Sequence, residues 1–118
     1  MLFRDIIGHT FIKKELQRNL TLGRIPHCQL ICGPEGSGAL PLAIAYARQV
    51  ICNELDQKAE FCNLKISELK HPDLHFVYPV ASNQDVKSKA ISSSFITNWR
   101  EFLSLNPYGN LFEWYMSI

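Results

Sequence analysis

The sequence carries no excess charge of either sign, because 12 lysines and arginines stand against 11 aspartates and glutamates. A chain that binds nucleic acid by itself usually presents a basic surface, and this composition has none overall. Disordered and acidic-tail classes are excluded too, since 47% of the residues are hydrophobic and 11% are aromatic. The 118 residues suffice for one domain with a single modest core.

Long hydrophobic runs are also missing, because no stretch approaches the ~20 apolar residues that a membrane helix needs. The first residues, 1–5, contain no apolar core of a signal peptide. We therefore expect a cytoplasmic protein with no membrane partner.

The sequence has four cysteines but lacks the C-x2-C spacing that is common in structural zinc sites. In a cytoplasmic chain we expect reduced thiols and no disulfide framework. Cys28 and Cys32 lie in an apolar run, so we expect two small buried side chains on the same face of a strand.

The other two cysteines, Cys52 and Cys62, bracket a polar stretch and are candidate metal ligands. A structural zinc site normally needs four nitrogen or sulfur ligands, so His71 or His75 would have to complete the set. His71 precedes a proline and His75 lies in a strand-like run, and we therefore expect no zinc here.

Helical periodicity appears in five segments. It predicts helices over 10–22, 39–53 and 61–69, one that starts at 92–94 and ends before 107, and one that starts at 110. Two short apolar runs, 27–32 and 74–80, predict buried strands, while 54–60 and 81–91 are polar connections.

The aromatic residues of the last two predicted helices recur at helical spacing; they are Trp99, Phe102, Trp114 and Tyr115. Such residues could stack on nucleic-acid bases. At this spacing they indicate core packing instead.

A glycine-rich turn lies between the first predicted strand and the helix that follows it, the context of a P-loop. Its residues are Gly33, Pro34, Glu35, Gly36, Ser37, Gly38, Ala39 and Leu40. The glycines match the pattern G-x4-G-K-[ST], but Ala39 replaces the lysine and Leu40 replaces the serine or threonine. These two positions therefore supply no ammonium for a β- or γ-phosphate and no hydroxyl for Mg²⁺. We predict a degenerate nucleotide-binding loop and do not expect ATP as a cofactor.

Other signs of catalysis are missing as well. Pro41 removes a backbone N–H near the helix start, where a phosphate would find donors. The run 74–80 ends in Ala81-Ser82 and not in an acid, so it supplies no Walker-B element. No Ser-His-Asp, Cys-His or paired-carboxylate spacing argues for a reaction, and we name no catalytic residue.

Three stretches occur in an informative order: 3–9 before the first helix, 24–30 running into the glycine-rich turn, and 71–76. Together they resemble the N-terminal part of bacterial clamp-loader AAA+ subunits of DNA polymerase III. The degenerate loop resembles the delta-prime subunit and not the ATP-hydrolysing gamma/tau subunit. The runs 71–80 and 106–110 are most similar to delta-prime of the Bacteroidetes type.

This resemblance implies an α/β fold, a P-loop NTPase (AAA+) three-layer sandwich with a parallel sheet. Residues 1–118 would be its N-terminal portion, with the helix 10–22, the degenerate loop 33–40 and a remnant of the family's zinc module at 52–70. The family's zinc module has four cysteines. In this chain only Cys52 and Cys62 can correspond to any of them, so zinc is not implied.

The function implied by the resemblance is that of a non-catalytic clamp-loader subunit. It would help place the sliding clamp on primed DNA during replication. Its partners would be the gamma/tau and delta subunits, with the clamp and the DNA contacted through the assembly.

Two other functions remain open on the sequence. One is a small adaptor whose aromatic final helix binds a partner protein. The other is an active P-loop phosphotransferase with an unusual loop, in which Lys87 or Lys89 supplies the missing lysine.

Overall fold

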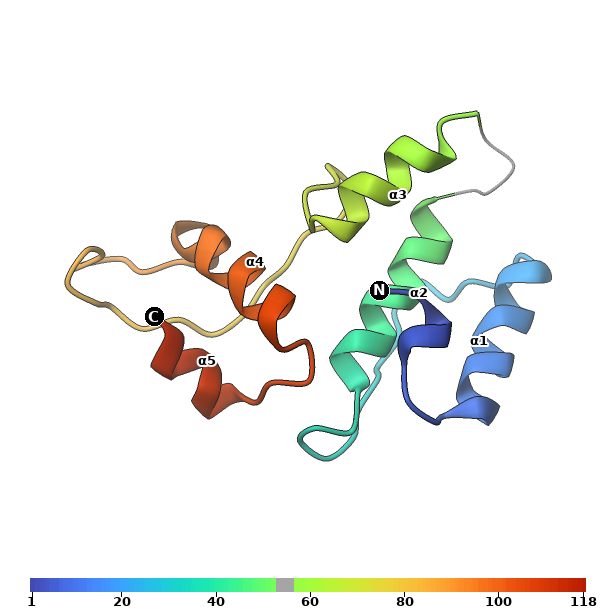
Figure 1. Ribbon diagram of the computed structural model, residues 1–118, viewed down its shortest axis with the longest axis horizontal. Coiled ribbons are helices and arrows are strands. Elements are labelled where there is room, and N and C mark those ends of the chain that lie inside the picture. The colour runs from blue at the N-terminus through green and yellow to red at the C-terminus, as the bar shows by residue number, and fades with distance from the viewer. Residues whose placement is uncertain (53–56) are drawn as a thin grey trace.

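The computed structural model describes residues 1–52 and 57–118. Its helices, in chain order, are η1 (Phe3–Asp5), α1 (Thr10–Thr21), α2 (Ala39–Ile51), α3 (Ala59–Ser67), η2 (Ser92–Phe95), α4 (Ile96–Leu105) and α5 (Leu111–Ser117). The molecule is elongated, with extents of 47 × 33 × 26 Å. Helices α1 and α2 lie at one end and α4 and α5 at the other (Figure 1).

The predicted parallel sheet is wrong, and with it the α/β three-layer sandwich of the P-loop NTPase (AAA+) type. No strand is found in the described part of the chain, which is helical (Figure 1). The two apolar runs 27–32 and 74–80 lie outside every helix, but a strand also needs a hydrogen-bonded neighbour. Without one, several of their apolar side chains stay uncovered: Leu30 is 88% exposed and Val77 is 94% exposed, although Tyr78 is buried against the helices.

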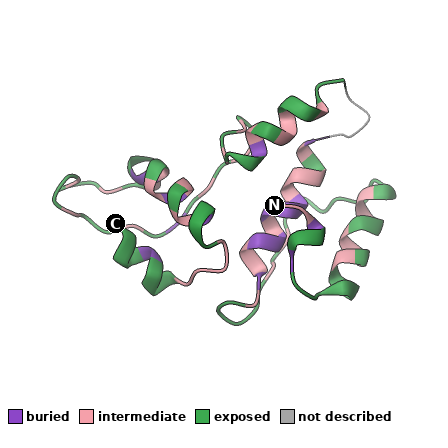
Figure 2. Ribbon diagram, in the orientation of Figure 1, coloured by how far each residue is buried: buried purple, intermediate pink, exposed green. Residues whose placement is uncertain are grey.

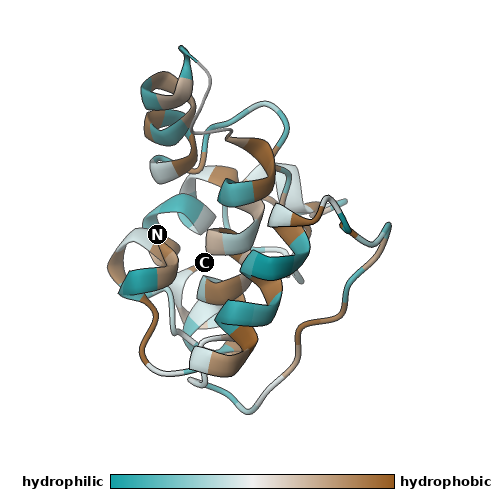
Figure 3. Ribbon diagram, turned by 90° about the vertical axis from the view of Figure 1, so that its right-hand side faces the viewer, coloured by the Kyte–Doolittle hydropathy of each residue, from teal (hydrophilic) through white to brown (hydrophobic). Residues whose placement is uncertain are grey.

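The helix predictions are confirmed in place and differ at the ends by a few residues. Each helix closes its own hydrogen bonds, so periodicity in a single segment is enough to specify it. Apolar and polar residues are interleaved along the helices (Figure 3). Position 53, the predicted end of the second helix, and part of the polar connection 54–60 lie outside the described residues.

The start of α5 is specified by two residues. The Asn110 side chain accepts a hydrogen bond from the Glu113 N–H at 2.9 Å, and the Glu113 carboxylate accepts one from the Asn110 N–H at 3.0 Å. This reciprocal capping box satisfies two donors that the helix itself leaves free.

Two hydrophobic clusters share α2, whose buried positions stand out in Figure 2. The first, here the aromatic cluster, consists of Ile44, Tyr78, Phe95, Trp99, Leu103 and Trp114. The second, here the N-terminal cluster, consists of Phe3, Ile6, Leu42, Ala45 and Tyr46. Because Ile44 faces one cluster while Leu42 and Ala45 face the other, α2 joins the two ends of the molecule.

The aromatic cluster is built from ring contacts. Tyr78 stacks on Trp99 at 4.2 Å between ring centroids, and Trp114 meets Trp99 edge-on at 5.0 Å. The predicted core role is thus confirmed for both tryptophans, which are nearly fully buried. Phe102 is half-buried, and the core prediction is wrong for Tyr115, which is 40% exposed because it lies on the outer side of α5.

Candidate functional site

The glycine-rich loop enters α2 with backbone angles that favour glycine. Gly36 has φ 74° and Gly38 has φ 93°, both in the left-handed region. Gly38 also has a neighbour: a Cβ placed there would stand 2.9 Å from the ring of Tyr108, whereas a Cβ at Gly36 would meet nothing within 4 Å. The loop therefore keeps its glycines for the turn and for contact with the 106–110 segment.

Two residues from elsewhere in the chain hold this loop. The His9 Nε2 lies 2.6 Å from the Ser37 carbonyl oxygen, to which it donates a hydrogen bond. The Tyr108 hydroxyl accepts a hydrogen bond from the Ile7 N–H at 3.3 Å. His9 itself has φ 54° at the start of α1, so a turn of the backbone carries its ring to the loop. In this arrangement the chain's own groups order the loop.

A groove of about 520 Å³ runs between α1, the 29–34 segment and the first residues of α2. Apolar side chains dominate it, among them Ile12, Leu16, Leu30 and Leu42. Of the described residues that line this groove, none is lysine, arginine, aspartate or glutamate.

Ala39 lines the same groove with a methyl group, at the position where the motif has its lysine. Pro41 lies buried in the first turn of α2, so one backbone donor is missing as expected. A triphosphate with Mg²⁺ needs cationic and oxygen ligands, and the residues present here do not fit it.

The structure does not favour a lysine supplied from elsewhere. The segment that carries Lys87 and Lys89 lies at one end of the molecule, beyond α4 and α5, whereas the glycine-rich loop lies below α2 near the middle of the view (Figure 1). An active phosphotransferase built on these lysines would need a different arrangement of the chain.

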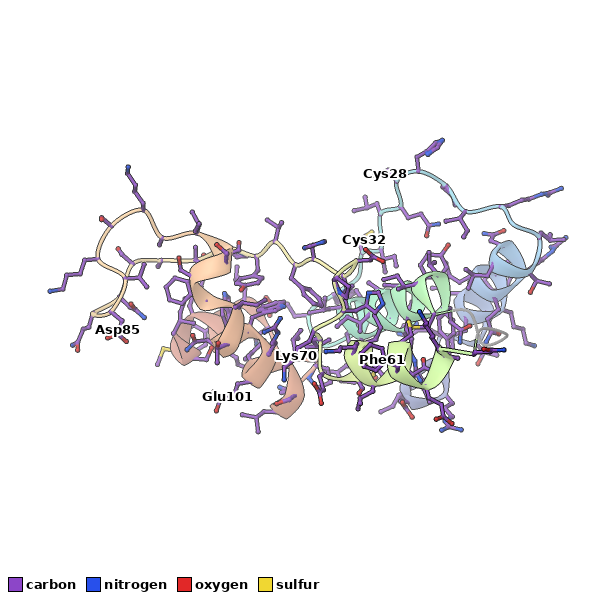
Figure 4. The ribbon with its side chains drawn as sticks, turned by 90° about the horizontal axis from the view of Figure 1, so that it is seen from above. Cys28, Cys32, Phe61, Lys70, Asp85 and Glu101 are labelled. Atoms are coloured by element: carbon purple, nitrogen blue, oxygen red, sulfur yellow. A yellow bond between two sulfur atoms is a disulfide. The ribbon has the colours of Figure 1, made fainter. Side chains whose placement is uncertain are left out.

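The predicted state of the cysteines is wrong for both pairs. Cys52 and Cys62 form a disulfide, with their Cα atoms 5.7 Å apart. Cys28 and Cys32 are free thiols, and both are exposed although the sequence predicted them to be buried (Figure 4). Sequence reasoning missed the disulfide because the approach of the end of α2 to the start of α3 is a tertiary feature. It misplaced the free cysteines because no neighbouring strand covers their segment.

Zinc does not fit Cys52 and Cys62 in this state. Their sulfurs are bonded to each other, so neither is a free thiolate ligand. Among the described residues no group of three or more histidines, cysteines, aspartates or glutamates could hold a metal ion. The Nδ1 of His71 accepts a hydrogen bond from the Asp73 N–H at 3.1 Å.

The adaptor alternative predicted an aromatic binding face on the final helix. Trp114 instead lies 1% exposed and donates its indole N–H to the Pro79 carbonyl at 2.7 Å. The side chains that α5 does expose are Phe112 and Met116, each 73% exposed.

Comparison with known families gives one match. The family model described as "DNA polymerase III, delta subunit" matches residues 8–116, which is nearly the whole chain. No curated protein and no solved structure matches the chain. In the described residues, every helix is too short or too polar to span a bilayer.

Proposed function

The chain belongs to the family of DNA polymerase III delta subunits, which have a role related to the clamp loader in DNA replication, and we propose which kind of subunit it is. It is a non-catalytic subunit of the delta-prime type, which helps load the sliding clamp onto primed DNA without using ATP itself. Neither ATP nor zinc is a cofactor of this chain in the proposal.

The observation that carries the proposal is the chemistry of the loop from Gly33 to Leu40. The loop keeps the glycines of a nucleotide site, while Ala39 and Leu40 take the places of the residues that bind phosphate and Mg²⁺. The apolar groove beside it supports the same interpretation, because its described lining has no charged side chain that would replace them.

The hydrogen bond between His9 and Ser37 and the packing of Tyr108 on Gly38 add a second line of support. In a working nucleotide site the phosphates bind the loop through its backbone N–H groups. Here the chain's own side chains hold the loop instead, His9 at the Ser37 carbonyl and Tyr108 against Gly38, so the loop can serve as a fixed part of a protein surface.

The proposed partners are the gamma/tau and delta subunits, and the clamp and primed DNA are reached through the assembly. A net charge of +1 suits a subunit whose main contacts are with protein. The proposed location is the cytoplasm, where bacterial DNA replication takes place.

Reconstitution tests this proposal. The chain is mixed with purified gamma/tau and delta subunits, and the mixture is followed by size-exclusion chromatography and by clamp loading on primed DNA. We expect co-elution, and we expect Ala39→Asp to load clamps within twofold of the unsubstituted chain. Aspartate is favoured in the first turn of a helix, so the substitution should not destabilise α2, whereas its negative charge would repel a bound phosphate.

The matched control places aspartate at the corresponding position, the P-loop lysine, of the ATP-hydrolysing subunit, which should abolish loading. Failure to co-elute, or a loss of loading with Ala39→Asp as large as in the control, would contradict the proposal.

A further inference from the structure

The two bonded cysteines differ sharply in their surroundings. Cys52, just after α2, is buried with 4% of its surface exposed. Cys62, in the first turn of α3, is half-buried. Any soluble molecule that exchanges with the disulfide therefore reaches the sulfur of Cys62 first.

A cavity of about 250 Å³ opens at Cys62. Lys58, His71 and Asp73 line it with polar groups, and Phe61 forms an apolar wall. Phe61 is 63% exposed and lies on α3 (Figure 4), so this side of the cavity faces solvent. A small thiol that carries its own charges suits such a lining.

Helix α3 stays attached to α2 by contacts other than the disulfide. Arg48 of α2 donates a hydrogen bond to the Asn63 side chain at 2.7 Å, and Ile66 is 1% exposed. After α3, the Leu69 carbonyl accepts a hydrogen bond from Arg100 at 3.0 Å. These contacts hold α3 in place when the bond between the two cysteines is open, so the two sulfurs stay close enough for the bond to form again.

We propose that Cys52 and Cys62 form a reversible redox pair, in which Cys62 exchanges with a small soluble thiol and its disulfide while Cys52 resolves the mixed disulfide. The inference rests on the proposed function for the compartment, because disulfides in the cytoplasm are usually transient and redox-sensing. A reactive, accessible cysteine beside a second, resolving one is the usual arrangement of such sensors.

The exchange balances as follows. The Cys62 thiolate attacks a disulfide RSSR, a Cys62–S–S–R bond forms, and one RS⁻ leaves. The Cys52 thiol then loses its proton and attacks the Cys62 sulfur, so that the Cys52–Cys62 bond forms and a second RS⁻ leaves. The two cysteines lose two electrons and RSSR gains two, and the protons of the cysteines pass to the two RSH products.

The test uses the full chain with Cys28→Ser and Cys32→Ser, because these exposed cysteines would also react. This background protein is reduced, then mixed with oxidised glutathione, quenched at intervals and mapped by peptide mass spectrometry. We expect the first adduct on Cys62, followed by the Cys52–Cys62 disulfide.

Single substitutions in the same background separate the two roles. With Cys52→Ser the Cys62 adduct should accumulate. With Cys62→Ser, capture at Cys52 should be at least tenfold slower. An adduct that appears first on Cys52 in the background protein, or no intramolecular disulfide there, would overturn the proposal.

The quenched time course on the background protein decides the question even where a single variant fails to fold. The proposed function fails by a different readout, the absence of co-elution with the clamp-loader subunits, which leaves these thiol rates unchanged.

Discussion

The two clusters that share α2 draw their partners from the chain in different ways. The aromatic cluster takes most of its members from residues 78–114, and its tryptophans contact each other and Tyr78 directly. The N-terminal cluster contains only one large ring beyond Phe3, that of Tyr46, and it borders an extended segment with exposed side chains. One end of the molecule is closed by aromatic packing, while the other leaves a groove beside the glycine-rich loop.

The difference shows which parts of the fold are specified by local interactions and which need a distant partner. Helices α4 and α5 satisfy their own backbone hydrogen bonds and only have to meet face to face. The extended segments 27–32 and 74–80 cannot do so, because a strand is stabilised by a partner from elsewhere. Both extended segments therefore carry strongly exposed apolar side chains, Leu30 beside the groove and Val77 near the aromatic cluster.

The largest effect is expected at the centre of the aromatic cluster. Trp114→Ala should lower the free energy of unfolding by about 3–5 kcal/mol, because it leaves a large cavity and removes several ring contacts. Urea denaturation followed by circular dichroism measures this loss.

The matched control for that substitution is Met116→Ala on the exposed side of the same helix, with an expected change within about 0.5 kcal/mol. Equal losses for Trp114→Ala and Met116→Ala would show that α5 is not packed as the structure has it.

A smaller effect separates the two tryptophans of the cluster. Trp114 donates its N–H to the Pro79 carbonyl, whereas the Trp99 N–H is buried without a hydrogen-bond partner among the described residues. Trp114→Phe removes a made hydrogen bond and should therefore cost about 1–3 kcal/mol more than Trp99→Phe.

Both variants shorten an indole to a phenyl ring, so each serves as the volume control of the other in urea denaturation. A larger loss for Trp99→Phe than for Trp114→Phe would contradict the assigned hydrogen bond.

At the glycine-rich loop the expected effect is of similar size for one glycine and smaller for the other. Gly38→Ala should destabilise the protein by about 1–3 kcal/mol, because a left-handed residue acquires a Cβ that meets the Tyr108 ring. Gly36→Ala should cost about 1 kcal/mol, since only the backbone conformation is strained.

Thermal unfolding of both variants checks this ranking, and Tyr108→Ala in the Gly38→Ala protein should recover part of the difference. Equal losses of stability for Gly38→Ala and Gly36→Ala would show that Tyr108 does not pack against Gly38 as described.

The smallest effect is expected in the extended segments. Val77→Lys and Leu30→Lys should each change the free energy of unfolding by no more than about 0.5 kcal/mol, because both side chains are exposed. In the buried sheet that the sequence predicts, the same lysines would be desolvated and would cost several kcal/mol. A loss above about 2 kcal/mol in urea denaturation would favour the sheet.

What could be predicted from the sequence follows the same division. The helices and the capping box at Asn110 and Glu113 were within reach, since each depends on residues close together in the chain. The burial of Trp99 and Trp114 was also within reach, because their helical spacing indicates a core-facing side. The sheet was not, because an apolar run indicates extended backbone without showing that another strand lies beside it.

The candidate site divides in the same way. The loss of the phosphate-binding lysine is visible in the sequence at Ala39, but the groups that hold the loop are not. His9 lies 28 residues before its partner Ser37, and Tyr108 reaches the loop from near the other end of the chain. The Cys52–Cys62 bond likewise depends on how α3 packs on α2.

The central claim is that the glycine-rich loop no longer serves a nucleotide, and isothermal titration of the chain with ATP and Mg²⁺ tests it most directly. The account predicts no saturable binding up to about 1 mM ATP, since no charged partner for the phosphates lines the groove. Mg²⁺-dependent binding with a micromolar dissociation constant would contradict it.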